Sequence, residues 1–231
     1  MWLKKSYRQS HLIALVDPPK LYIYWFAPLS QKNTLFTLRA HHTYTIPGLD
    51  HAPYMLSNST SMVKAIHHFL KLYQPKTTSF SFIMTPPTLF EFFVTSAKTH
   101  PDDSDMLIHF PPGIIGQYHY ICPTIDDTSL FYLCGIPPYL RAQYQMCALQ
   151  AHINIVSLCP YSLGFFHTYR HIQGPAFRPS KLSADIEQKK RPISLVNPAI
   201  LEHIIGNIQS QENMHHLTVA FGTYIVQKDI L

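Results

Sequence analysis

The sequence predicts an α/β fold in which a main subdomain, formed by residues 1–86 and 152–231, carries an inserted small α+β subdomain at 87–151. Two observations predict this arrangement. Short segments rich in β-branched and aromatic residues alternate with segments of helical periodicity along most of the chain. The same alternation then starts again, in shorter segments, after the break at Pro86-Pro87.

The chain opens with three expected strands, at 11–16, 21–26 and 34–45, which are rich in aromatic and β-branched residues. Turn-forming residues at 17–20 and 30–33 separate them. Short polar connections of this kind join antiparallel neighbours, so we expect a three-stranded meander.

The clearest helix is predicted at 60–73, and a strand at 79–84 follows it. Lys64, His68 and Lys71 fall on the side of this helix that is expected to meet solvent. The apolar residues recur at helical spacing and define the buried side, which consists of Met62, Val63, Ile66, Phe69, Leu70 and Tyr73.

The inserted subdomain is expected to contain strands at 88–95, 118–122 and 130–136 and helices at 101–110 and 137–151. Acidic residues at the start of the first helix are favourable at a helix N-terminus. Prolines mark the start of the second helix. The series predicts a small sheet accompanied by two helices.

The main subdomain is expected to resume with a strand at 154–158 and a helix at 161–172, and to close with a helix at about 215–227. Between them, residues 174–198 contain four prolines and most of the local charge. We interpret this stretch as a linker-like excursion.

The charge of the chain argues against a nucleic-acid partner. The 231 residues have a net charge of +5, but the basic residues are scattered, and the longest cluster, 189–191, is too short to follow a nucleic-acid backbone. A solvated loop and a weak contact with an anionic membrane surface are both compatible with this cluster. No apolar run reaches the length of a membrane span or a signal peptide. We therefore expect a cytoplasmic protein that does not insert into the membrane.

Cysteine and histidine are arranged in a way that argues against a metal site. The four cysteines lie twelve or thirteen residues apart without a CxxC pair, and three adjacent pairs occur among the fifteen histidines. Adjacent side chains point in different directions on a strand or a helix, so such pairs chelate one ion poorly. We predict buried, reduced thiols and no metal.

The order of these elements resembles that of the PilM family, the actin-like proteins of type IV pilus and competence machines. The strand–turn–strand start at 12–26 stands where that family has its first phosphate loop, and 154–163 resembles its strand running into a helix. The closing helix of the family is similar to 219–223. The resemblance implies a truncated actin-like, ribonuclease H-like domain. Its second lobe would be missing, because only a few proline-broken residues lie between Pro179 and Pro198.

The sequence departs from the actin-like ATPases at the phosphate loop. Those proteins hold nucleotide and Mg²⁺ on glycine-containing hairpins that begin Asp-x-Gly, whereas the first hairpin here reads Asp17-Pro18-Pro19-Lys20. Proline adds bulk and removes a backbone donor where phosphate would bind. No Asp-x-Gly or Gly-Gly occurs in the sequence. We therefore expect a degenerate phosphate loop without a nucleotide cofactor.

The resemblance also implies a partner. Proteins of the PilM family hold the short N-terminal cytoplasmic tail of a bitopic inner-membrane protein, PilN, in a groove between the main and small subdomains. Phe90 and Phe92 share one face of the first inserted strand beside this joint, so we expect them to line a groove for a PilN-like tail. Burial of these aromatics in the core is the alternative.

The implied function is that of a non-catalytic scaffold in a type IV pilus or competence machine, peripheral to the bacterial inner membrane. The cytoplasmic actin-like component of a type II secretion system is an alternative. An enzyme, either an actin-like ATPase or a hydrolase, is the other class. A hydrolase would use Ser162 or Cys159 with a distant histidine, but no Gly-x-Ser-x-Gly elbow surrounds Ser162. We assign no catalytic residue.

Overall fold

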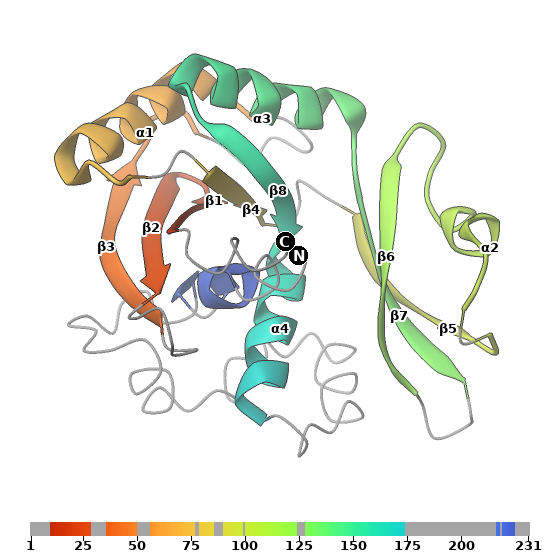
Figure 1. Ribbon diagram of the computed structural model, residues 1–231. Coiled ribbons are helices and arrows are strands. Elements are labelled where there is room, and N and C mark those ends of the chain that lie inside the picture. The colour runs from red at the N-terminus through yellow and green to blue at the C-terminus, as the bar shows by residue number, and fades with distance from the viewer. Residues whose placement is uncertain are drawn as a thin grey trace, which may run out of the picture.

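The computed structural model describes residues 10–28, 36–49, 56–76, 79–85, 90–98, 100–123, 128–173, 216–217 and 219–224. Their strands form two separate sheets, one of five strands and one of three (Figure 1). We call the part of the chain built on the larger sheet the main subdomain, and the part built on the smaller sheet the inserted subdomain. The predicted excursion at 174–198, including the region where a second lobe would stand, lies outside the described residues.

The main sheet has the strand order β3-β2-β1-β4-β8. β1 (His11–Asp17), β2 (Lys20–Pro28) and β3 (Phe36–Thr45) are antiparallel neighbours, which confirms the predicted meander. β4 (Ser79–Met84) and β8 (Asn154–Pro160) continue the sheet in parallel with β1. Parallel neighbours require long crossovers, and here these contain a helix or the whole inserted subdomain.

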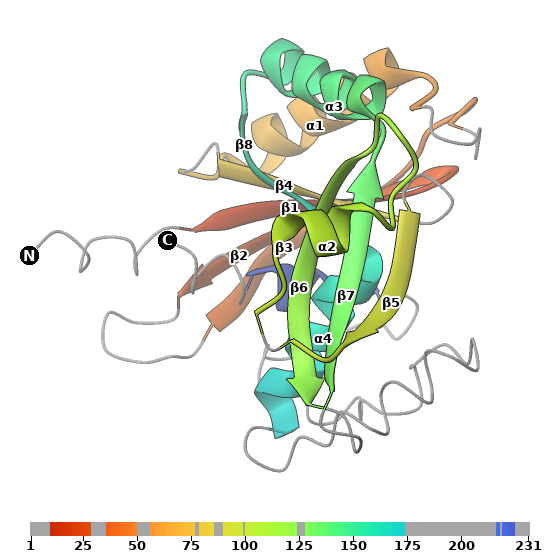
Figure 2. The ribbon, with the colours of Figure 1, turned by 90° about the vertical axis from the view of Figure 1, so that its right-hand side faces the viewer.

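Helices cover both faces of the main sheet (Figures 1 and 2). α1 (Ser59–Tyr73) and α3 (Pro138–Ala151) lie side by side on one face. α4 (Tyr161–Gln173) and a C-terminal helical segment, defined here as 216–217 and 219–224, cover the other face. Because both faces are buried, β1 is a continuous apolar run rather than an alternating one.

The caps of α1 explain where it begins and ends. Asn58 precedes the helix, and its side chain accepts a hydrogen bond from the backbone N–H of Ser61 at 3.4 Å. Gln74 ends the helix in a left-handed conformation with φ 45°, and Pro75 follows it. The buried face contains the predicted Met62, Val63, Ile66 and Phe69 together with Ala65.

The inserted sheet has the order β5-β7-β6 and is antiparallel throughout. Its strands are β5 (Phe90–Ser96), β6 (Ile115–Pro123) and β7 (Ser129–Ile136). The short helix α2 (Asp103–Leu107) covers one face of the sheet. A separate small core forms there, where Met106, Phe131 and Leu133 meet the partly buried Phe92, Val94 and Phe110.

α3 packs differently from its predicted place in the inserted subdomain. It lies against α1, and its apolar residues belong to the core of the main sheet. The ring of Tyr144 on α3 is 5.1 Å from that of Phe82 on β4. The surface that a helix covers decides its subdomain, and the order of elements along the chain does not reveal that surface.

Candidate functional site

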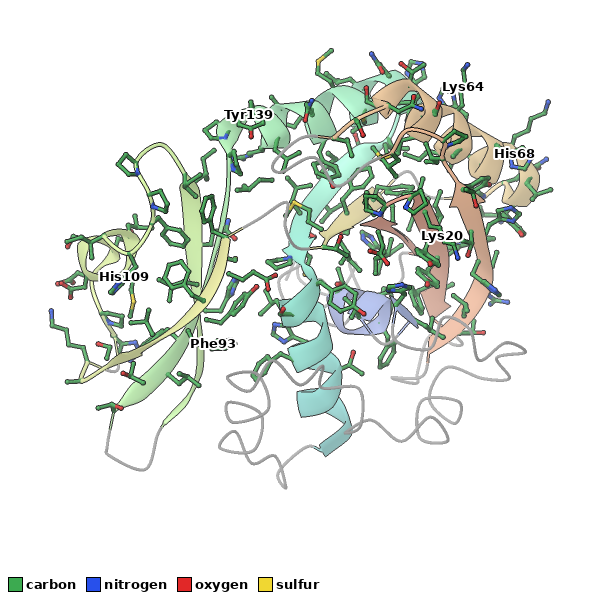
Figure 3. The ribbon with its side chains drawn as sticks, turned by 180° about the vertical axis from the view of Figure 1, so that it is seen from behind. Lys20, Lys64, His68, Phe93, His109 and Tyr139 are labelled. Carbon is green, nitrogen blue, oxygen red and sulfur yellow. The ribbon has the colours of Figure 1, made fainter. Side chains whose placement is uncertain are left out.

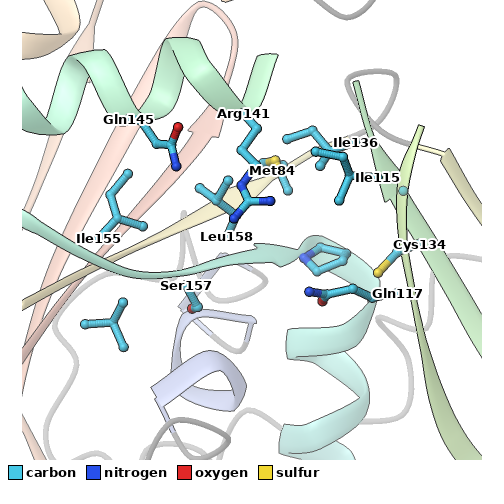
Figure 4. A pocket seen from close by; sticks show the side chains of 13 residues that line it. Met84, Ile115, Gln117, Cys134, Ile136, Arg141, Gln145, Ile155, Ser157 and Leu158 are labelled. Carbon is cyan, nitrogen blue, oxygen red and sulfur yellow. The ribbon is translucent and has the colours of Figure 1, made fainter. Parts of the chain in front are cut away.

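A cleft of about 340 Å³ lies where the two subdomains meet (Figure 4). β8 and α3 form its walls on the side of the main subdomain, and the ends of β6 and β7 form the opposite wall. Pockets of this volume are at the lower end of the range for ligand sites. The cleft is therefore large enough for one or two side chains of an extended peptide.

The β8 wall offers an open strand edge. In the part of the chain that the structure describes, β8 pairs with β4 on one side and is the last strand of the sheet on the other. The pairing register shifts after Phe80, which leaves Val156 without an opposite residue on β4 as a β-bulge. Val156 is 38% exposed. An edge strand presents backbone N–H and C=O groups with which an extended peptide can pair.

Most residues that line the cleft are apolar, but polar atoms contribute almost half of its exposed surface, with polar side chains from three elements. Gln117 comes from β6, Ser157 from β8, and Arg141 and Gln145 from α3 (Figure 4). Arg141 is the one charged side chain among the lining residues. An apolar site with a few polar groups binds a ligand by burial and orients it through a small number of hydrogen bonds.

The hydroxyl and thiol groups at the cleft are poorly suited to nucleophilic attack. Burial raises the pKa of the Cys134 thiol to about 12, so the thiol is neutral near pH 7. Ser157 Oγ donates to Ser81 Oγ at 2.9 Å, and Ser81 Oγ is 2.9 Å from His11 Nε2. Burial lowers the pKa of His11 to about 4. Because Ser81 has no exposed surface, this set of three side chains fits a structural link across β8, β4 and β1 better than a catalytic relay.

A polar contact joins the subdomains on the α4 face of the main sheet. Ser162 Oγ on α4 donates to Glu91 Oε2 on β5 at 2.7 Å. On the same face of the inserted sheet, the ring of Phe93 is 5.3 Å from that of Tyr132, and both pack against the core of the main subdomain. Burial raises the pKa of the Glu91 carboxyl, and the hydrogen bond from Ser162 offsets only part of this effect.

Replacing Glu91 by Gln is expected to change how stability depends on pH. The pKa of Glu91 is higher in the folded chain than in the unfolded chain. The contribution of the Glu91 carboxyl to the free energy of unfolding is therefore fully present below the unfolded pKa of about 4.3. This contribution is lost as pH rises through the folded pKa. Gln stays neutral, so the stability of E91Q relative to the unmodified chain should rise with pH. Urea unfolding at several pH values from mildly acidic to mildly alkaline measures this. A difference that stays constant with pH would contradict the prediction.

The predicted phosphate loop is the tight turn between β1 and β2. Asp17 Oδ2 is 3.3 Å from His216 Nε2 in the C-terminal helical segment, and the ring of His216 is 4.4 Å from that of Tyr22. The carbonyl of Pro19 accepts a hydrogen bond from Ile46 N–H at 2.8 Å. Lys20 is exposed (Figure 3). The turn is thus held by contacts within the chain, and the absence of nucleotide binding stays a prediction.

The structure places the two predicted groove residues on the far face of the inserted sheet. The ring of Phe92 is 5.2 Å from that of Phe110, in the small core beneath α2. Phe90 shares this face by strand alternation. Phe93 and Glu91 carry the face that turns toward the main subdomain, opposite His109 (Figure 3). The prediction that Phe90 and Phe92 line the groove is therefore wrong. Strand alternation predicts that β5 has two faces, but it does not say which of them α2 covers.

The described residues contain no group of three or more His, Cys, Asp or Glu arranged to hold a metal ion. Two of the adjacent histidine pairs, at 41–42 and 67–68, lie within this part of the chain. His215 lies outside it, so the prediction of no metal stays a prediction. None of the described helices is both long and apolar enough to cross a bilayer.

No family model and no curated protein matches this chain. Among solved structures, the PilM–PilN type IV pilus biogenesis complex matches with a TM-score of 0.58 and 11% identity, covering 71% of this chain. The cytoplasmic domain of EpsL, an inner membrane component of the type II secretion system of Vibrio cholerae, matches with a TM-score of 0.43 and 6% identity, over 68% of this chain and 57% of that one. A Bacteroides thetaiotaomicron protein with an actin-like ATPase fold and unknown function has a TM-score of 0.39 and 12% identity, over 75% and 61%.

These similarities define the class of fold. The first structure carries the argument, because the TM-scores of the other two are below 0.5. The chain spans about half, 51%, of the length of the matching chain of the PilM–PilN complex. The protein is a mixed α/β chain with a truncated actin-like fold, which confirms the predicted fold class.

Sequence reasoning missed the residues that form the cleft walls. It assigned Arg141 and Gln145 to a helix of the inserted subdomain, and the one residue of β8 that it singled out, Cys159, is not among the lining residues. One signal was present in the sequence, because Arg141 is the single charged residue of α3. That this charge lies at the joint between the subdomains could be seen only from the packing of α3.

Proposed function

We propose that this chain is a non-catalytic cytoplasmic scaffold of the PilM type, peripheral to the bacterial inner membrane, in a type IV pilus or type II secretion machine. It holds the N-terminal tail of a bitopic, PilN-like inner-membrane protein in the cleft between β8 and β6. The observation that carries the proposal is the open edge of β8 beside an apolar cleft. The fold similarity to a complex of PilM with PilN supports this class of partner.

The cleft accounts for binding without catalysis. A tail strand pairs with the outer edge of β8 and inserts one or two aliphatic side chains between the subdomains. Burial of each anchor contributes about 1.5 to 3 kcal/mol. Ordering of the tail opposes this gain, so micromolar affinity is expected. ATP has no role in this proposal, because prolines occupy the phosphate hairpin and Asp17 already contacts His216.

The test uses a synthetic peptide with the cytoplasmic N-terminal tail of the bitopic membrane protein encoded beside this chain. Gln117 lines the cleft and is exposed, so Gln117→Trp should block the cleft without disturbing the core. We expect at least about tenfold weaker binding of the tail by this variant, as the loss of one anchor predicts. Fluorescence polarisation of the labelled peptide measures the affinity.

The matched control is His109→Trp, which adds the same bulk on the opposite side of the inserted sheet and should leave binding unchanged. Millimolar ATP with Mg²⁺ should not alter the affinity. Unchanged binding by the Gln117→Trp variant would show that the tail binds outside the cleft. Absence of binding to the unmodified chain, or an affinity that depends on ATP, would overturn the scaffold proposal.

A further inference from the structure

The side of the α1–α3 layer that faces away from the sheet has a distinctive composition. Figure 3 shows Lys64 on α1 and Tyr139 on α3 on this outer side. We call it the basic face, and it consists of the exposed residues Lys64, Lys71, Tyr139, Met146 and Leu149.

The basic face contains positive charge without negative charge. None of the thirteen acidic residues of the chain falls within α1 or α3. The two cations, Lys64 and Lys71, form no ion pair within the described ranges. Cations that are exposed and lack intramolecular partners attract an anionic surface.

An apolar stripe on α3 lies beside these charges, because α1 and α3 are neighbours. Tyr139, Met146 and Leu149 are seven and three residues apart, so they line one side of α3, and they are 50%, 53% and 69% exposed. The opposite side of α3 is apolar as well and is buried against the main sheet. The exposed side of α3 therefore carries three large apolar side chains, whereas the exposed side of a surface helix is usually polar.

We infer that the basic face binds the surface of a membrane that contains anionic phospholipids. Lysine beside exposed aromatic and aliphatic side chains is typical of helices that lie in a lipid interface. The cations contact phosphate headgroups, while the stripe on α3 enters the boundary between headgroups and acyl chains. Each Lys or Arg near such a surface strengthens binding by roughly fivefold. The proposed tail cleft is not needed for this contact.

The test is flotation of the full chain with vesicles, without any partner peptide. One set of vesicles is phosphatidylcholine alone, and the other contains about one third phosphatidylglycerol. We expect binding to the anionic vesicles only, and release in about 1 M NaCl, where the screening length falls to about 3 Å. The double variant Lys64→Glu with Lys71→Glu should bind at least about 25-fold more weakly. Leu149→Ser should also weaken binding, and its remaining binding should still be released by salt.

The double variant Lys20→Glu with Lys76→Glu is the matched control, because it makes the same change of charge at two exposed positions outside the basic face. Melting temperatures of all variants verify that the exposed substitutions leave the fold intact. The inference fails if the unmodified chain does not bind the anionic vesicles. That result would favour an acidic protein as the partner of the basic face. The inference also fails if the variant of Lys64 and Lys71 binds as well as the variant of Lys20 and Lys76, because the overall charge of the chain would then account for the binding.

Discussion

Replacing Gly222 by Ala is expected to lower the free energy of unfolding by about 3 kcal/mol. Helix propensity alone predicts the opposite sign, since Ala is favoured over Gly by about 1 kcal/mol within a helix. The reason is the crossing of the C-terminal helical segment with α4. A Cβ at Gly222 would overlap the carbonyl oxygen of Gly164 and would lie 2.6 Å from Thr168 Oγ1. A backbone atom has no rotamer with which to move aside, so the two helices must separate.

Urea unfolding of the variant measures this loss. Gly164→Ala tests the same crossing from the other side, because its Cβ would lie 2.6 Å from the carbonyl oxygen of Val219. Ala142→Leu, at an exposed position of α3, is the control and should change stability by less than about 0.5 kcal/mol. A Gly222→Ala chain as stable as the unmodified one would show that the helices do not cross this closely.

Replacing Phe82 by Ala is expected to cost about 3 to 5 kcal/mol. Phe82 lies on β4, between β1 and β8 in the main sheet, and has no exposed surface. Its ring is 5.3 Å from that of Phe80 and 5.1 Å from that of Tyr144, so the substitution leaves a cavity between the sheet and α3. Domains are stable by only about 5 to 15 kcal/mol, so the melting temperature should fall strongly.

Thermal and urea unfolding check this second prediction. Phe92→Ala is the matched control, because it removes the same side chain at a partly buried position of the inserted sheet. We expect a loss of roughly 1.5 kcal/mol there, since less apolar surface is taken from water. Equal losses at the two positions would contradict the difference in burial between the two cores.

The elements whose side-chain pattern repeats strongly were predictable from the sequence. The helix expected at 60–73 is α1 (Ser59–Tyr73), and the strand expected at 79–84 has those bounds in the structure. The described part of the closing helix, 216–217 and 219–224, is helical as predicted. Period and turn chemistry are local properties, so each is visible within a window of a few residues. α2 is shorter than the predicted 101–110. It ends at Leu107, four residues before Pro111 and Pro112.

The sequence by itself therefore determined the fold class, the order of the elements and the unusual hairpin at 17–20. Only the tertiary structure decided that α3 joins the main layer, that Glu91 and Phe93 rather than Phe90 and Phe92 turn toward the main subdomain, and that Gly222 lies against Gly164. Each of these is a choice between two faces of an element. Strand alternation and helical periodicity define such faces but do not say which surface each will meet, because that surface comes from residues distant along the chain. The cleft lies between elements whose meeting depends on those choices, so its residues became visible only in the folded chain.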